Sequence, residues 1–303
     1  MSARILLAGL AAAATAACAP LVGLPNSAGP TPDPRAWAAA CTEMDDWDKP
    51  GPPFRVYGNT YYVGTCGITA LLVTGPQGHV LIDSGTDKGA DVVLANIRAL
   101  GFDPRDVKAV LISHEHFDHV GGMARIQAAT GATVVATPDA AKVLRTGKTA
   151  AADPQAGSGH PPFAPVSGPI SEVRDERPRT FAGMAFTPMM TPGHTLGATS
   201  WSWQSCADGV CQTIVYVDSL NPISDETYRF SDHPALVSAF RAGIASVAAA
   251  PCDVVLAPHP SAAAMRDRLL GAKPLVDPAG CRAYAATAAA RLDARLAKEG
   301  AGG

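Results

Sequence analysis

The chain has 303 residues, of which 47% are hydrophobic and 17% are charged, so it is long and apolar enough to bury a large core. Its net charge of −3 and the lack of a basic block argue against a nucleic-acid-binding protein. It has no apolar run of about eighteen residues or more, and therefore predicts no transmembrane segment.

The first residues have the pattern of a secretory signal peptide. Arg4 supplies a positive charge, and residues 5–17 form an apolar stretch that is too short to span a membrane. Small residues at 14–16 suit ordinary signal peptidase, whereas Thr15 to Cys18 resembles a lipoprotein box with Cys18 as the lipidated residue. Both alternatives predict a signal peptide over residues 1–18 and a periplasmic protein, with or without a lipid anchor.

The rest of the chain divides into a short arm and one large domain. Residues 19–45 are rich in Pro, Gly, Ser and Ala at their start and predict a leader and arm, and residues 46–303 predict the domain. The expected elements are strands at 54–57, 60–63, 68–74 and 79–83, a helix at 87–100, a strand at 107–112, a helix at 123–129, a strand at 132–136, a helix at 139–144, a long loop at 145–169, strands at 181–187, 198–204 and 212–217, a helix at 234–249, a strand at 253–257, and helices at 261–270 and 277–299. Strands followed by helices occur twice, which predicts two β/α halves packed sheet to sheet with helices outside.

The densest cluster of chemically active residues follows the strand at 107–112. Residues 113–122 read Ser-His-Glu-His-Phe-Asp-His-Val-Gly-Gly, and so hold His114, His116, Asp118 and His119 within six positions. A strand that ends in such residues just before a helix delivers them to one edge of a sheet. Neutral imidazole and carboxylate are ligands that zinc prefers, and so compact a loop can serve two neighbouring ions.

Two further histidines occupy similar places. His194 lies in a Thr-Pro-Gly-His-Thr turn between strands, and His259 follows the strand at 253–257. A histidine beside Pro or Gly is more often a solvated loop residue, but these two complete the number of ligands that two zinc ions need. The remaining histidines, His79, His160 and His233, are expected to be surface or capping residues.

Cysteine usage agrees with export. Apart from Cys18 there are six cysteines, an even number that suits an oxidising compartment. Pairing of near neighbours predicts Cys206–Cys211 across a hairpin, Cys252–Cys281 between the last strand and the last helix, and Cys41–Cys66 between the arm and an early strand. This is one of about fifteen arrangements that six cysteines allow. Free buried cysteines in a cytosolic enzyme are the alternative.

The order of these motifs resembles the metallo-β-lactamase superfamily, and in detail the third subclass of its class B β-lactamases. The residues that carry the resemblance are His-x-His-x-Asp-His at 114–119, Pro-Gly-His-Thr at 192–195, Tyr-Gly-Asn-Thr-Tyr-Tyr-Val-Gly-Thr at 57–65, Asp-Ser-Leu at 218–220 and Ala-Pro-His-Pro at 257–260. The similarity runs from about Trp47 to the last helix. It implies an α/β fold, a four-layer αββα sandwich of two mixed sheets flanked by helices, and the predicted cysteine pairs resemble those of one branch of the subclass.

The resemblance also implies the roles of the site residues. His114, His116 and His194 would hold one of two zinc ions per chain, and Asp118, His119 and His259 would hold the other. The two ions would activate water to hydrolyse the β-lactam amide of penicillins, cephalosporins or carbapenems, with Asp118 as a catalytic residue, and so confer antibiotic resistance. Ser219, Asn221 and Gln155 are candidate substrate contacts, Asp83 is a candidate support for the ligands, and Glu115 is expected to point away from the metals.

Other functions remain open at this stage. If Asp218 instead of Ser219 occupied the ligand position, Asp218 would bridge the metals as in glyoxalase II, a thioesterase. A lactonase of the same fold and a metal-binding protein without turnover are further alternatives. The preferred β-lactam does not follow from the sequence. We expect a monomer whose partner is a small-molecule substrate.

Overall fold

The structure is a computed structural model that describes residues 32–42 and 44–301, so the predicted signal peptide and Cys18 lie outside the described residues. Its elements are α1 (Pro34–Ala40), β1 (Phe54–Tyr57), β2 (Thr60–Tyr62), β3 (Leu71–Gly75), β4 (Gly78–Ile82), α2 (Gly89–Ala99), η1 (Pro104–Asp106), β5 (Val107–Leu111), α3 (Phe117–Val120), α4 (Met123–Thr130), β6 (Thr133–Ala136), α5 (Pro138–Thr146), β7 (Ile170–Glu172), β8 (Arg179–Phe181), β9 (Met184–Met190), β10 (Thr199–Ala207), β11 (Val210–Tyr216), η2 (Phe230–Asp232), α6 (Pro234–Ala249), β12 (Val254–Leu256), η3 (Pro260–Ala263), α7 (Met265–Leu269) and α8 (Gly280–Ala301). No helix in this part of the chain is long and apolar enough to cross a membrane.

The strands form two mixed sheets. The first has seven strands in the order β1 to β7, antiparallel from β1 to β4 and parallel from β4 to β7. The second has five strands in the order β12, β11, β10, β9 and β8, and only the pair β11 and β12 is parallel. Each sheet therefore has parallel strands whose carboxyl ends reach a common edge.

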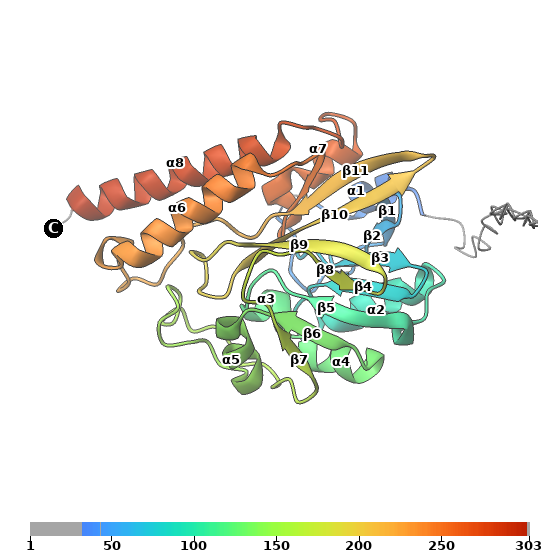
Figure 1. The fold of residues 1–303 in the computed structure, drawn as a ribbon, viewed down its shortest axis with the longest axis horizontal. Helices are drawn as coiled ribbons and strands as arrows, with labels where there is room; N and C mark the ends of the chain where they lie inside the picture. The colour runs from blue at the N-terminus through green and yellow to red at the C-terminus, as the bar shows by residue number, and fades with distance from the viewer. Residues whose placement is uncertain (1–31, 43, 302–303) are drawn as a thin grey trace, which may run out of the picture.

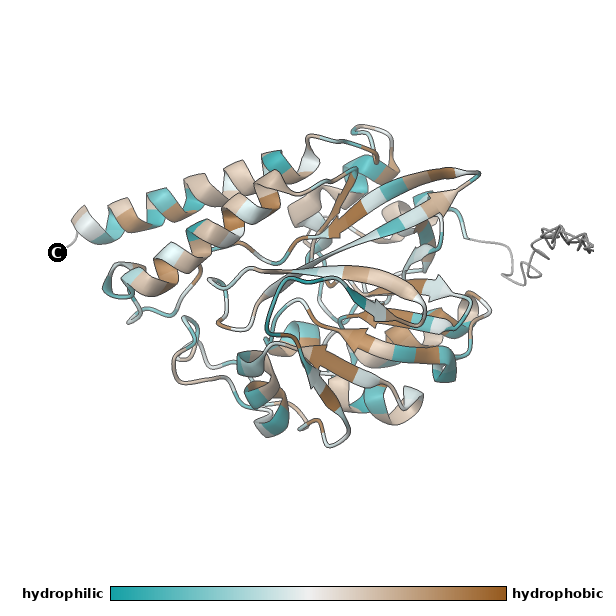
Figure 2. Cartoon of the chain, viewed as in Figure 1, coloured by the Kyte–Doolittle hydropathy of each residue, from teal (hydrophilic) through white to brown (hydrophobic). Residues whose placement is uncertain are grey.

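Three hydrophobic cores fix the order of the layers. One core joins residues of both sheets, the second joins the first sheet to α2, α4 and α5, and the third joins the second sheet to α6 and α8. Strand β3 shows why this works: Leu71 and Val73 enter the core between the sheets, and Leu72 enters the helix-covered core, because neighbouring side chains point to opposite faces. The result is the predicted αββα sandwich (Figure 1). Hydrophobic residues concentrate on the strands between the helical layers (Figure 2).

Several expected elements differ from those observed. The single strand expected at 181–187 is a hairpin of β8 and β9, because Ala182 and Gly183 both adopt positive φ and reverse the chain. The helix expected at 261–270 is broken at Ala264, whose φ of 50° is incompatible with a continuous helix. Helix α3 inside the His/Asp motif and the short edge strand β7 were not predicted.

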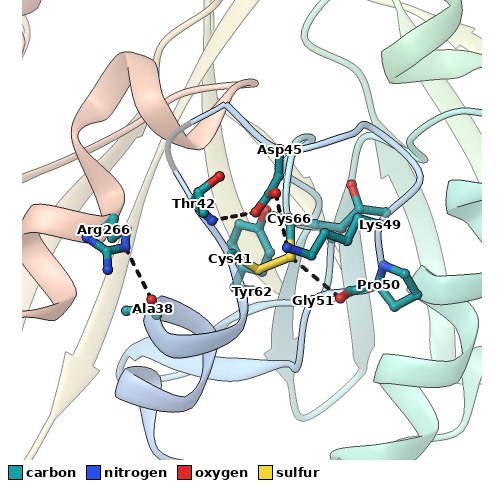
Figure 3. Close-up of a disulfide and its surroundings, with 12 residues drawn as sticks. Ala38, Cys41, Thr42, Asp45, Lys49, Pro50, Gly51, Tyr62, Cys66 and Arg266 are labelled. Atoms are coloured by element: carbon teal, nitrogen blue, oxygen red, sulfur yellow. Dashed lines mark hydrogen bonds and ion pairs between the residues drawn. A yellow bond between two sulfur atoms is a disulfide. The ribbon is translucent and has the colours of Figure 1, made fainter.

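The described part of the arm, from residue 32 onward, is more ordered than its composition suggests. Helix α1 begins with Asp33, whose side chain accepts a hydrogen bond from the Arg35 amide. Trp37 is 1% exposed and packs against Phe54 and Tyr62, so residues of the predicted arm belong to the core between the sheets. The cysteines pair as predicted, in Cys41–Cys66, Cys206–Cys211 and Cys252–Cys281. Figure 3 shows the first of these bridges holding the arm beside Tyr62.

Candidate metal centre

All six predicted ligands come from segments at one edge of the two sheets. His114, His116, Asp118 and His119 follow β5. His116 lies immediately before α3, and Asp118 and His119 lie within this short helix. His194 follows β9, and His259 follows β12. Neighbouring rings in this cluster lie 4.2–5.1 Å apart between centroids. Residues up to 145 positions apart in sequence therefore form one cluster, because each lies just after the end of a strand.

The first group consists of His114, His116 and His194, whose ligand atoms all lie within 4.8 Å of one another. Each ring has one nitrogen held by a protein acceptor. His114 Nδ1 lies 2.8 Å from Asp218 Oδ1, His116 Nε2 lies 3.2 Å from both Asp153 carboxylate oxygens, and His194 Nδ1 lies 3.0 Å from the Asn221 carbonyl. In the neutral form of each ring, these contacts put the proton on the held nitrogen and leave the other nitrogen with its lone pair.

The electrostatics of this group favour metal binding. Burial, reinforced by the other imidazoles, holds the pKa of His114 well below its ordinary value and lowers that of His194 to about 3. Both rings are therefore neutral at physiological pH, as a metal ligand must be. His114 Nε2 is buried and has no hydrogen-bond partner among the described residues. An uncompensated buried nitrogen is costly unless a metal ion fills its coordination.

The second predicted group consists of Asp118, His119 and His259. The ligand atoms of Asp118 and His119 lie within 4.8 Å of each other and of a His114 nitrogen, and His259 joins them through Asp118. His119 Nε2 lies 2.9 Å and His259 Nε2 lies 3.5 Å from Asp118 Oδ2. Neither nitrogen of His119 has a partner in hydrogen-bond geometry within the described chain, although Asp118 is so close. These nitrogen and carboxylate oxygen atoms are close together but are not aligned for hydrogen bonds. Atoms that bind a common metal ion are arranged in the same way.

The pKa values in this group differ from those of the first. Burial alone would raise the pKa of Asp118, but the imidazoles of His119, His259 and His116 outweigh it and hold the pKa below its ordinary value. Burial would lower the pKa of His119, yet Asp118 and Asp83 raise it. Burial lowers the pKa of His259 to about 4. The carboxylate is thus ionised and ready to bind a cation.

Asp83 supports the loop that carries the ligands, as predicted. It adopts a positive φ of 61°, and its carboxylate accepts hydrogen bonds from the Ser113 amide and hydroxyl at 2.7 Å and from Tyr216 Oη at 2.8 Å. His119 Nδ1 lies 3.7 Å from the same carboxylate. Burial raises the pKa of Asp83, and these donors oppose that rise. The residue fixes the start of the motif and faces one of its ligands.

Glu115 points away from the ligand cluster, as expected, but it is buried and has a defined task. Its carboxylate accepts hydrogen bonds from Thr195 Oγ1 at 2.7 Å and from the Gly197 amide at 2.9 Å. These two residues follow His194 directly. Glu115 therefore fastens the turn that carries one ligand to the motif that carries four others.

Asp218 lies behind His114 and not between the two ligand groups. It is fully buried, its Oδ1 meets His114 Nδ1, and its Oδ2 has no partner among the described residues. Burial raises the pKa of this carboxyl well above its ordinary value. The position that faces the cleft belongs to Ser219. A carboxylate that bridges two metals would have to lie between the two ligand groups, and Asp218 does not lie there.

A cleft of about 550 Å³ opens in front of the cluster. Ser219 and Asn221 line it, as expected for substrate contacts. Its lining residues are Met44, Asp45, Trp47, Gly67, His194, Ser219, Asn221, Ile223, His259, Ser261, Ala262, Tyr284 and Arg291. The segment with Met44 and Asp45 is held at its base by the Cys41–Cys66 bridge, and Asp45 accepts hydrogen bonds from Thr42 and Lys49 (Figure 3).

Two predictions about the loop between α5 and β7 were wrong. Gln155, a predicted substrate contact, is 7% exposed and does not line the cleft; its backbone N–H donates a hydrogen bond to the Asp153 carboxylate inside the loop. His160, expected at the surface, packs against His116 and Phe117, with ring centroids 5.5 and 5.3 Å away. The loop lies against the motif, where Asp153 contacts His116 and Gln155 is buried. His233, by contrast, is exposed just before α6, and His79 packs against Phe102 far from the site.

Asp153 and Asp218 were not predicted to face ligands. Asp153 lies in a Gly/Pro/Ala-rich loop with no periodicity, and only its charge distinguished it. For Asp218, the sequence signal that could have predicted its role was its position shortly after a buried strand. His259 and the central motif occupy the same kind of position.

Comparison with known proteins agrees with this geometry. The family model of the metallo-beta-lactamase superfamily matches residues 63–206. The MIM-2 metallo-beta-lactamase structure is 52% identical, with a TM-score of 0.83 over 89% of this chain and 99% of that one. MEM-A1, a subclass B3 metallo-beta-lactamase from a soil metagenome library, is 41% identical, with a TM-score of 0.80 over 85% of this chain and all of that one.

A more distant similarity covers a smaller part of the chain. The N-acyl homoserine lactonase AttM of Azorhizobium caulinodans is 34% identical over 85 residues, 20% of this chain, and the chain spans only about a third (31%) of that curated relative.

The chain therefore belongs to the metallo-β-lactamase superfamily. Within it, the chain groups with the subclass B3 enzymes, which it matches along nearly its whole described length.

Proposed function

We propose that this protein is a dizinc β-lactamase, a hydrolase that opens the amide bond of the β-lactam ring. Its similarity to subclass B3 enzymes over their full length supports this function. The observation that carries it is the pair of ligand groups at one sheet edge, with Ser219 and not Asp218 facing the cleft beside them. With a serine at this position, the protein ligands of the two metals would be histidine and aspartate side chains alone.

The two ligand groups suit zinc. His114, His116 and His194 would hold one ion, and Asp118, His119 and His259 would hold the second. Bound zinc supplies Lewis acidity, which lowers the pKa of water to about 7 and polarises a carbonyl group. No covalent intermediate on a serine is needed for this chemistry.

The protein's own residues do the remaining work. Asp118, kept ionised by the surrounding imidazoles, would accept a proton from the attacking water and pass that proton to the ring nitrogen as the amide bond breaks. The side chains of Ser219 and Asn221 bind the carboxylate that β-lactams carry beside the ring nitrogen. Apolar surface on Met44, Trp47 and Ile223 packs against the substituents of the ring.

One alternative rests on a specific observation. The match to N-acyl homoserine lactonases over about 85 residues favours a lactonase of the same fold. A lactone and a β-lactam both present a strained or activated carbonyl to the same ligand set. The lactonase match covers a fifth of the chain, whereas the subclass B3 match covers 85% of it.

The test is hydrolysis by purified mature protein of a penicillin, a cephalosporin, a carbapenem and an acyl homoserine lactone. We expect turnover of β-lactams, including the carbapenem, that a chelator abolishes and added zinc restores. Inhibitors that acylate serine should leave the rate unchanged, and intact mass should show no acylated protein during turnover. Preferred turnover of the lactone, or stable acylation of a serine, would contradict the proposal.

We further propose that the protein is exported to the periplasm and works as a monomer. The motif for export, including Cys18, lies outside the described residues, and the three disulfides support an oxidising compartment. Titration of native, zinc-loaded mature protein should find none of these six thiols free. Two or more accessible thiols would contradict the pairing.

A further inference from the structure

One cation stands on the wall of the cleft without a partner. Arg291 of α8 lines the cleft together with Ser219, Asn221 and His259, and it is exposed. Among the described residues, no hydrogen bond or ion pair engages its guanidinium. Arg295, one turn later, behaves differently, because it binds Glu299 at 2.5 Å and Ser224 Oγ at 2.7 Å. Arg291 is therefore free to bind a ligand, whereas Arg295 is a structural residue.

The backbone of Arg291 is held in a fixed position relative to the metal ligands. Tyr284, two turns earlier on α8, also lines the cleft, and its hydroxyl donates a hydrogen bond to the Asp218 carbonyl at 3.1 Å. Asp218 in turn supports His114 and precedes Ser219. The start of α8 is tied to the strand segment by Cys252–Cys281, and its end is tied by the Glu299 carboxylate, which accepts from the amides of residues 230 and 231.

The charges around the cleft leave the guanidinium uncompensated. Asp45, a carboxylate on the lining, is already engaged by Lys49 Nζ at 3.0 Å and by the Thr42 amide. Ser219 and Asn221 are neutral and lie next to the metal cluster. Arg291 thus provides a second place for negative charge, on the helix wall beyond the two neutral groups. Guanidinium is well suited to this task because its planar donors match carboxylate geometry.

We infer that Arg291 is a specificity-determining residue that recognises an anionic substituent on the substrate, so that the enzyme favours β-lactams carrying a second carboxylate or sulfonate. This inference rests on the proposed β-lactamase function. Apolar lining from Met44, Trp47 and Ile223 accommodates the body of the substituent, while Arg291 binds its charge. The contact forms in the ground state and in the transition state alike, so it changes KM and not kcat.

The experiment compares Arg291→Gln and Arg291→Glu with the wild type on two matched pairs of substrates. In one pair, benzylpenicillin and carboxybenzylpenicillin differ by a carboxylate on the acyl side chain. In the other, two cephalosporins differ by a carboxylate on the substituent at the opposite end of the ring system. Arg282→Gln is the control, because Arg282 is an exposed arginine of the same helix that does not line the cleft.

We expect the Gln variant to raise KM for the dianionic member of at least one pair by about two- to fivefold, the effect of one exposed ion pair, with kcat unchanged. The Glu variant should raise it further, and the control should not. The preference should weaken between about 0.01 M and 1 M salt, as the Debye length falls from about 30 to about 3 Å. Unchanged discrimination in both pairs would overturn the inference.

A binding measurement separates this inference from the proposed function. Trp47 lines the cleft and is 40% exposed, whereas Trp37, Trp201 and Trp203 are buried, so ligands in the cleft should quench Trp47 fluorescence. Isophthalate and benzoate, which cannot be hydrolysed, differ by one carboxylate. Tighter binding of the dicarboxylate that Arg291→Gln removes supports the inference even if no β-lactam is turned over. Equal effects of the variant on both ligands would contradict it.

Discussion

The two ligand groups of the metal centre are built differently. Each ring of His114, His116 and His194 is oriented by an acceptor that faces its second nitrogen. In the other group, His119 has no partner in hydrogen-bond geometry among the described residues, and the His259 side chain is 31% exposed to the cleft. His119 lies between two carboxylates, with Asp118 2.9 Å from one ring nitrogen and Asp83 3.7 Å from the other.

This difference implies that the two ligand groups have different roles in metal binding and in substrate binding. Preorganised ligands lose little entropy on binding, so the three-histidine group should hold its ion tightly and in one geometry. The second group can adjust, which suits a site that must also receive a substrate. The predictions below test this difference in roles, beginning with the largest expected effect.

Replacing Asp118 by Ala should affect the second group alone and abolish most activity. Because this carboxylate lies beside both His119 and His259, its removal should release or displace one zinc ion and reduce kcat by roughly 10²- to 10⁴-fold. Zinc content by mass spectrometry and steady-state kinetics measure both effects. Two tightly bound zinc ions in this variant would contradict the assignment of Asp118 as a ligand.

Replacing Asp218 by Asn should weaken the first group without emptying the second. The amide keeps the size of the side chain but no longer attracts the His114 proton as strongly, so zinc affinity at this group should fall by about 10- to 100-fold. Competition with a chromogenic chelator measures it. Loss of the second ion as in the Asp118 variant would instead indicate that Asp218 bridges the metals.

Chelator titration of the wild type should remove the two ions in order. The ion of the second group should leave first, at a chelator concentration at least about tenfold lower, because its ligands are held by longer contacts than those of the first group. Cobalt substitution followed by absorbance can distinguish the two sites. Simultaneous loss of both ions would mean that the two groups act as one unit.

Replacing Ser219 by Ala should have the smallest effect. A serine is a poor zinc ligand, so both ions should remain, and the loss of one hydrogen bond of about 1 kcal/mol should raise KM by roughly tenfold or less. Zinc analysis with kinetics on one penicillin suffices to check this. A missing zinc ion would show that the hydroxyl belongs to the metal centre.

Much of the fold could be predicted because its signals are local. Alternation such as Leu71, Leu72 and Val73 sends side chains to both faces of a sheet, and the motif at 114–119 follows directly from a buried strand. Helix α1 was missed because its composition suggests a leader, whereas the burial of Trp37 depends on strands that come later in the chain. The β8–β9 hairpin was missed although Gly183 marked it.

The candidate site also has one part that could be predicted from the sequence and one part that could not. The six predicted ligands lie together, and their roles as zinc ligands stay a prediction. The contacts that orient them depend on tertiary structure: His114 and Asp218 are 104 positions apart, and His116 meets Asp153 across a loop without periodicity. For the same reason Gln155 and His160 were misplaced, since the contact between Asp153 and His116 has no signal in the sequence of that loop.

The Cys41–Cys66 bridge has a consequence for how this enzyme can evolve. It anchors the base of a cleft wall whose outer residue, Met44, is 87% exposed. A side chain that contacts solvent and substrate but not the core can be replaced with little change in folding stability. Position 44 is therefore a natural target for randomised libraries and for selection in the field, where the substrate range can drift while the metal centre stays the same.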